Sequence, residues 1–168
     1  MFTGAAEGFR RDAIRKAALA GSAILALCFG IAIYLLDRDW ASTLFLTPFT
    51  AYQPEAVGFF GLPGLVLPSL LHAYAFSLLV ILALDGGRSA RQVGVLSWFL
   101  VAAGLEILQA GQFQDLLSGP TLNSSASTVI TSIQSYAVNG HFDFGDLVAS
   151  GVGCMLAYSI ASVLEETK

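Results

Sequence analysis

The chain has 168 residues, of which 55% are hydrophobic and only 12% are charged, and its formal net charge is −4. A soluble domain carries roughly 25% charged residues, so this composition excludes an ordinary water-facing surface and predicts an integral membrane protein. No basic patch with interleaved aromatic residues occurs, which argues against nucleic acid as a partner.

The first apolar run covers residues 17–36 and contains 20 residues without a charge. At about 1.5 Å per residue it spans roughly 30 Å, the thickness of the bilayer hydrocarbon. A cleavable signal peptide would also show a basic start followed by an apolar stretch. This run is longer than the usual core of about 7–15 residues in a signal peptide, and no A-x-A site follows it. We therefore expect an uncleaved membrane anchor.

The connection over residues 37–64 is long but not polar in character. Its aromatic residues are Trp40, Phe45, Phe49, Tyr52, Phe59 and Phe60, and they are interrupted by Pro48, Pro54 and Pro63. Aromatic rings with polar handles suit the membrane–water interface. The composition favours a segment that lies on the outer membrane face, with a re-entrant segment as the alternative.

Three further apolar runs predict the remaining spans, at about residues 65–84, 93–113 and 142–164. Gly86 and Gly87 suit the C-terminal end of the second span. Residues 114–140 are rich in Ser, Thr, Asn and Gly and contain no Lys or Arg. Within them, residues 127–138 show a weak helical periodicity that would suit the membrane surface.

Charge placement predicts the orientation. With a cytoplasmic N-terminus and four spans, seven of the eight basic residues lie inside, namely Arg10, Arg11, Arg15, Lys16, Arg88, Arg91 and Lys168. Only Arg38 lies outside, which is a strong positive-inside bias. The predicted fold is therefore an all-α four-helix transmembrane bundle, a single domain over residues 1–168. Both termini are expected to be cytoplasmic and the interfacial segments extracytoplasmic.

Polar groups within the spans are few, and each charged one costs roughly 2.5–3.5 kcal/mol on insertion scales. The rise per residue places His72 and Glu106 each about 10 Å below the outer surface. Asp143, Asp146 and Ser150 follow one another at spacings of three and four, so they share one side of the last helix. Gly153 and Ala157 continue that side as a stripe of small residues. We infer a polar pocket open to the outside, with His72, Glu106, Gln109, Asp143, Asp146 and Ser150 as its ligand-binding residues.

A structural interpretation of the same residues stays open. In it, Glu106 only accepts a hydrogen bond from His72. Asp143 and Asp146 then only cap the last helix, near its positive end.

These residues also carry a resemblance to a known family. A histidine in an apolar helix (LLHAYAFSLL) is followed by an E-x-x-Q pair (LEILQ) and then by D-x-x-D before a glycine-containing helix (FDFGDLVASGVG). In this order, over residues 65–158, the sequence resembles the VanZ-like family of small bacterial membrane proteins. The resemblance implies a four-helix protein of the bacterial cytoplasmic membrane and cell envelope, linked in some members to glycopeptide (teicoplanin) resistance. It implies no established reaction.

Three functions follow as hypotheses. The first is an envelope protein that binds a lipid-linked or cell-wall-related ligand, and the second is a non-catalytic subunit of a larger membrane complex. The third is an enzyme with Glu106 and His72 as acid and base, although no nucleophile elbow, HExxH or phosphate-binding glycine loop occurs.

Other chemistries are weaker expectations. His72, Glu106 and Asp146 could hold a divalent metal, and His72 with His141 a haem, but we expect no cofactor and no metal. Four spans make a small pore, which argues against a channel or transporter. Membrane lipids and other membrane subunits are the expected partners. Cys28 and Cys154 lie in apolar runs and are expected to be small packing residues.

Overall fold

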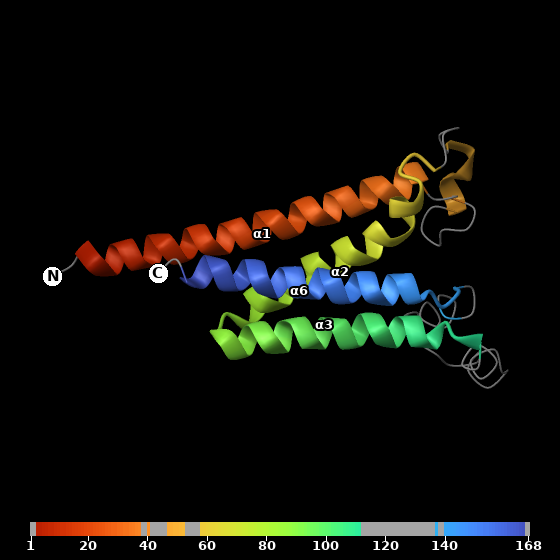
Figure 1. The fold of residues 1–168 in the computed structure, drawn as a ribbon. Helices are drawn as coiled ribbons and strands as arrows, with labels where there is room; N and C mark the ends of the chain where they lie inside the picture. Colours follow the sequence, from red (N-terminus) through yellow and green to blue (C-terminus); the bar gives the residue numbers. More distant parts are fainter. Residues whose placement is uncertain are drawn as a thin grey trace, which may run out of the picture.

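The structure, a computed structural model, describes residues 3–37, 40, 47–52, 58–111, 137 and 140–166. Within these residues the long elements are four α-helices: α1 (Thr3–Asp37), α2 (Leu62–Leu84), α3 (Arg88–Leu108) and α6 (Phe144–Glu166). A short 3-10 helix, η2 (Thr47–Tyr52), follows α1. Each long helix is long and apolar enough to cross a membrane. The predicted four-helix bundle of a multi-pass membrane protein is therefore confirmed (Figure 1).

Helix α1 begins 14 residues before the predicted span. Ala, Arg, Lys and Glu, which favour helices, make up eight of the fourteen residues of this segment. Asp12 also forms ion pairs one turn away, with Arg15 at 2.9 Å and Lys16 at 3.0 Å. Such pairs stabilise helices by a few tenths of a kcal/mol each. The 35 residues of α1 extend about 52 Å, so its first turns stand beyond the bilayer core.

Helix α3 ends five residues earlier than the predicted span. The N–H groups of Gln109 and Ala110 donate to carbonyl oxygens three residues back, those of Glu106 and Ile107, at 3.0 Å each. These tighter bonds end the α-helix and place Glu106 in its last turn, two residues before the helix end where the prediction placed it seven before. Residues 112 and 113 of the predicted span lie outside the described part of the chain.

The turn between α2 and α3 differs slightly from the expectation. The left-handed position after α2 is taken by Asp85 (φ 42°), whose N–H donates to the Ile81 carbonyl oxygen. Aspartate tolerates this conformation because its short polar side chain can bond locally. The two predicted glycines, Gly86 and Gly87, follow it and lead into α3.

Helix α2 is the centre of the bundle and contacts each of the other three long helices. It approaches α6 most closely at Gly153, where an added Cβ would collide with the Leu70 carbonyl oxygen and stand 3.0 Å from the Tyr74 nitrogen. It approaches α3 at Gly94, where a Cβ would stand 2.8 Å from Ile81 Cγ1. Small residues let helix backbones come together in this way.

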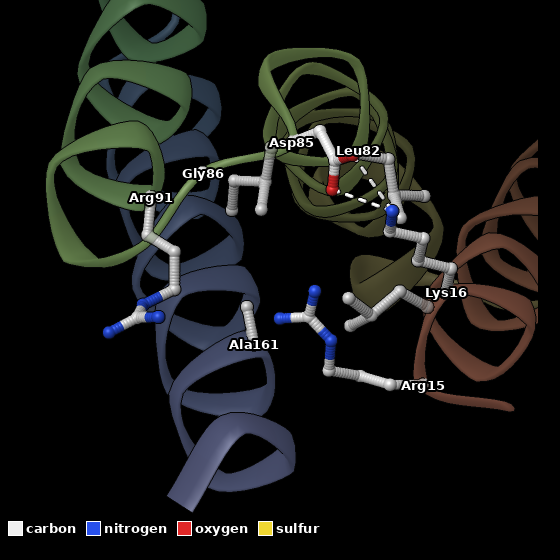
Figure 2. Close-up of a pocket in the computed structure, with 9 residues that line it drawn as sticks. Arg15, Lys16, Leu82, Asp85, Gly86, Arg91 and Ala161 are labelled. Atoms are coloured by element: carbon white, nitrogen blue, oxygen red, sulfur yellow. Dashed lines mark hydrogen bonds and ion pairs between the residues drawn. The ribbon is translucent and has the colours of Figure 1, made fainter. Parts of the chain in front are cut away.

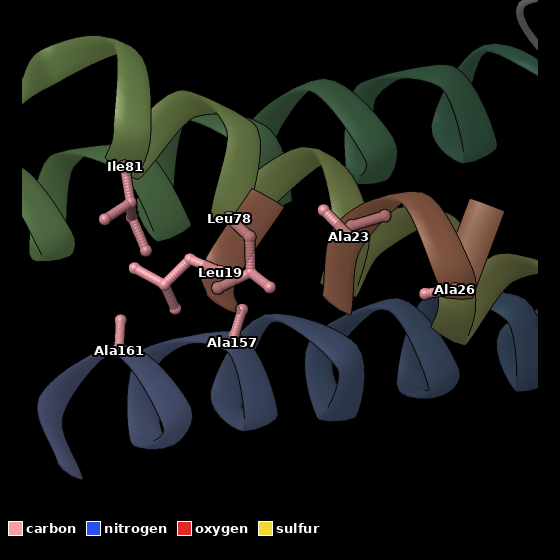
Figure 3. Packing of buried hydrophobic residues seen from close by; sticks show 8 residues of the cluster. Leu19, Ala23, Ala26, Leu78, Ile81, Ala157 and Ala161 are labelled. Atoms are coloured by element: carbon pink, nitrogen blue, oxygen red, sulfur yellow. The ribbon is translucent and has the colours of Figure 1, made fainter. Parts of the chain in front are cut away.

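The main apolar core is made of small and aliphatic side chains from α1, α2 and α6 (Figure 3). Leu19 of α1 lies between Leu78 of α2 and Ala157 of α6. Cys154 is buried nearby and accepts a 3.4 Å hydrogen bond from Ser77. Cys28 is exposed on α1, so only one of the two cysteines has the expected packing role.

The basic residues gather at the end of the bundle where both termini lie (Figure 1). Lys16 of α1 forms an ion pair with Asp85 after α2, at 2.7 Å. Arg91 of α3 forms one with Glu165 near the end of α6. Six of the seven basic residues that the sequence places together thus lie at one end, which we call the basic end. Lys168, the seventh, and Arg38, predicted on the other side, lie outside the described residues.

At the opposite end, α1 is tied to the start of α2. The Phe60 N–H donates to the Asp37 carboxylate at 2.6 Å, and the Phe60 ring meets Phe29 edge-on. Phe49 and Tyr52 of η2 are exposed, as interfacial aromatics would be. The predicted interfacial segment over residues 114–140, including the weak helix at 127–138, lies almost wholly outside the described residues.

Candidate functional site

Asp143 is the N-cap residue of α6. Its side chain accepts a 2.7 Å hydrogen bond from the Gly145 N–H, and its carbonyl oxygen accepts the first helical bond, from Leu147 at 3.2 Å. This satisfies one of the unpaired donors that every helix start leaves exposed. The capping role that the sequence left open is therefore present for Asp143.

Glu106 completes the cap from a different helix. The Asp143 N–H donates to the Glu106 carboxylate at 3.3 Å. In a capping box, that N–H is bound by a Glu or Gln at the third position of the same helix. Here the acceptor comes from α3, and the third position of α6 holds Asp146. This arrangement fixes Glu106, which is only 9% exposed, at the joint between α3 and α6.

Asp146 is directed to α2. Its carboxylate accepts a 2.7 Å hydrogen bond from the Ser69 hydroxyl. An acid in the first turn of a helix is also favoured by the partial positive charge there. Three helices therefore contribute to one polar group of residues, Ser69 from α2, Glu106 from α3, and Asp143 with Asp146 from α6. We call these four residues the acid cluster.

Gln109 and Ser150 border the acid cluster. Gln109 follows α3 one turn after Glu106 and is buried. Its side-chain amide lies against the backbone of Gly140, where an added Cβ would collide with it. Ser150 is buried one turn after Asp146 on α6. Both predicted residues thus adjoin the acid cluster, Gln109 at the end of α3 next to Glu106 and Ser150 on α6 next to Asp146.

His72 is not part of this group. Its Nδ1 donates to the Pro68 carbonyl oxygen one turn earlier on α2, at 2.7 Å. Its ring packs edge-on against Tyr34 of α1 and stacks on Phe76 of α2, which in turn stacks on Trp98 of α3. The hydrogen bond between His72 and Glu106 that the structural interpretation required is absent from the described residues. The acid–base pair and the metal site both required His72 and Glu106 in one pocket. The structure does not bring these two side chains together.

The acid cluster is electrostatically one-sided. Glu106 accepts the Asp143 N–H, and Asp146 lies one turn farther along α6, so three carboxylates gather at this joint. Within the described residues, no Lys or Arg forms an ion pair with Glu106 or Asp143. In that same part of the chain, no three His, Cys, Asp or Glu side chains are placed to hold a metal ion. The cluster is therefore suited to a cationic or hydrogen-bond-donating group.

Two clear hollows in the described structure lie at the basic end, and neither is lined by the acid cluster. The outward pocket around these acids stays a prediction from the sequence. Ser69 was not among the predicted site residues. Its signal in the sequence is a hydroxyl one turn before His72, in a helix that also carries Ser77.

Searches against family models, curated proteins and solved structures gave no match.

Proposed function

We propose that the chain is a VanZ-like membrane protein of the bacterial cell envelope. In this proposal the acid cluster binds a lipid-linked or cell-wall-related ligand through a cationic or hydroxylated group. The observation that carries the proposal is the convergence of Glu106, Asp143 and Asp146 with Ser69 at the end opposite the basic residues. The resemblance of the sequence motifs supports the family, and the basic end supports a cytoplasmic side for both termini.

The chemistry of the cluster supports this ligand class. Carboxylate oxygens accept hydrogen bonds from ammonium and hydroxyl groups, and charged hydrogen bonds contribute about 1.5–3 kcal/mol. Sugars and amino-sugar or peptide groups of envelope precursors present such donors. Glu106 uses one carboxylate oxygen to accept the Asp143 N–H within the bundle, and its second oxygen can accept a hydrogen bond from a ligand.

The test is complementation of a gene-deleted bacterium. We expect deletion to raise susceptibility to teicoplanin, and we expect the parent gene to restore the original minimum inhibitory concentration. Glu106→Gln and Asp146→Asn should each fail to restore it, because each removes a negative charge and keeps the side-chain shape. Protein amounts in the membrane fraction are measured by immunoblot in every strain.

The matched control is Glu7→Gln, the same substitution at an exposed position on α1. It should restore resistance fully. If Glu106→Gln and Asp146→Asn are present at parent levels and restore the phenotype as well as Glu7→Gln does, the acid cluster has no such binding role.

A non-catalytic subunit of a larger membrane complex is the second candidate. It is favoured by α3, which exposes an apolar face at Val93, Leu96 and Leu100. The spacing of three and four residues puts these side chains on one side of the helix, where a neighbouring subunit or lipid would pack. Purification in a mild detergent distinguishes the two, because a lone monomer at every stage would contradict the subunit role.

A further inference from the structure

The larger hollow at the basic end is an open groove of about 540 Å³ between α1 and the end of α6. Its walls include Arg11, Asp12, Ile14, Arg15 and Ala18 of α1 and Leu164 of α6. Asp12 is paired with Arg15 and Lys16. Its volume falls within the range of about 300–1,000 Å³ that small-molecule sites occupy. Cationic and apolar side chains therefore line the same groove, at the membrane boundary.

Two guanidinium groups in this groove have donors to spare. Arg11 is exposed, and the described residues give it no ion pair. Arg15 donates from one terminal nitrogen to Asp12 at 2.9 Å, but its Nε is buried and has no hydrogen-bond partner among the described residues. Buried donors without a partner are rare and usually indicate a missing water or ion.

Arg15 separates this groove from a smaller hollow, which has room for about one water molecule. In Figure 2 the Arg15 side chain extends from α1 toward Ala161 of α6 and Leu82 of α2. Lys16 points to Asp85 instead and is bound there (Figure 2). Arg15 is thus held in place while part of its guanidinium lacks a hydrogen-bond acceptor. The charge of the neighbouring Lys16 is already paired, with Asp85 and Asp12.

The positions of Arg11 and Arg15 along α1 match the headgroup layer of a bilayer. The uncharged run of α1 starts after Lys16, so Arg15 lies at the hydrocarbon boundary. Arg11 lies about 6 Å farther out at 1.5 Å per residue, and a headgroup layer is about 5–8 Å thick. Ala18 follows Arg15 by three residues and so lies on its hydrocarbon side, and Leu164 of α6 lines the same groove. The charges therefore stand at headgroup depth, with an apolar wall below them.

We propose that this groove binds one anionic phospholipid. The phosphate lies between Arg11 and Arg15, which supply charge-assisted hydrogen bonds to its oxygens. One acyl chain lies along Ile14, Ala18 and Leu164. A zwitterionic lipid or an apolar partner helix would bring no net negative charge to these donors, so charge complementarity favours the anionic lipid.

The experiment is native mass spectrometry of the full chain purified in a neutral detergent. Dioleoyl phosphatidylglycerol and dioleoyl phosphatidylcholine are titrated separately, because they share acyl chains and differ in net charge. We expect phosphatidylglycerol to bind at about tenfold lower concentration. Arg11→Gln should weaken phosphatidylglycerol binding about tenfold and leave phosphatidylcholine binding unchanged. Arg11 makes no contact that folding requires, so this variant should fold.

Two matched controls make the result specific. Arg88→Gln removes an exposed charge at the same end but outside the groove, and it should bind like the parent. Ala18→Trp fills the apolar wall and should lower phosphatidylglycerol binding, whereas Leu25→Trp, at a 71% exposed position farther along α1, should not. Equal binding of the two lipids would overturn the proposal. Equal losses of phosphatidylglycerol binding in Arg11→Gln and Arg88→Gln would also overturn it. The same holds if free glycerol phosphate displaces phosphatidylglycerol at the concentration at which phosphatidylglycerol itself binds.

Discussion

Ser69 and Asp146 join the second and the last spanning helices through a 2.7 Å hydrogen bond, 77 residues apart in the sequence. The bond lies beside the joint where Glu106 of α3 accepts the Asp143 N–H. Because both bonds hold the start of α6, the position of the acids depends on α2 and α3 together. The acid cluster is thus part of how the bundle is assembled as well as a candidate binding site.

The first prediction concerns this bond. Ser69→Ala leaves Asp146 without its hydroxyl donor, and a hydrogen bond to a charged group contributes about 1.5–3 kcal/mol. For a chain of this size we expect the midpoint of thermal unfolding to fall by about 3–12 °C, measured on detergent-purified protein. Ser69→Thr keeps the hydroxyl and should stay near the parent. An unchanged midpoint for Ser69→Ala would show that the bond contributes little.

The spans were largely predictable because membrane helices are specified by length and apolar composition. The ends were less predictable because they depend on local bonds. Helix α1 continues through its basic segment on the strength of Asp12 ion pairs, and α3 stops early where Gln109 turns back to Glu106. Neither effect changes hydropathy, so a hydropathy reading could not place these boundaries.

The second prediction concerns orientation. His141 and Ser89 are both exposed but lie at opposite ends of the bundle. In a background with Cys28→Ala and Cys154→Ala, a membrane-impermeant maleimide applied to intact cells should label His141→Cys. It should label Ser89→Cys only after the cells are opened. This follows from the positive-inside rule, since six basic residues lie at the Ser89 end. The reverse labelling pattern would overturn the predicted orientation.

The candidate site was predicted in part. The three acids do come together, because Asp143 caps α6 with its backbone N–H on Glu106, and Asp146, three residues later, meets Ser69 of α2. His72 lies apart from the acid cluster because α2 contacts all three of the other long helices. Residues three apart on a helix differ by about 60° around its axis, so Ser69 meets α6 while His72 meets α1. A sequence shows the phase of each helix but not which helix occupies each side of α2.

The third prediction tests the contact that allows this arrangement. Ser150, Gly153 and Ala157 are all buried on α6, and at Gly153 the backbone of α2 leaves no room for a Cβ. Gly153→Ala should therefore separate the helices and cost about 1–3 kcal/mol, as overpacking of a close contact does. We expect the thermal unfolding midpoint to fall by about 2–4 °C per kcal/mol.

Gly151 supplies the control for that experiment, because it lies two residues earlier on the same helix. A Cβ there would stand 3.5 Å from a carbon of the Phe99 ring, an ordinary contact distance. Gly151→Ala removes the same flexible residue from α6, and alanine favours a helix by about 1 kcal/mol over glycine. It should therefore leave the unfolding midpoint unchanged or raise it. If both variants change stability alike, the effect comes from helix propensity, and the close approach of α2 at Gly153 does not limit the bundle.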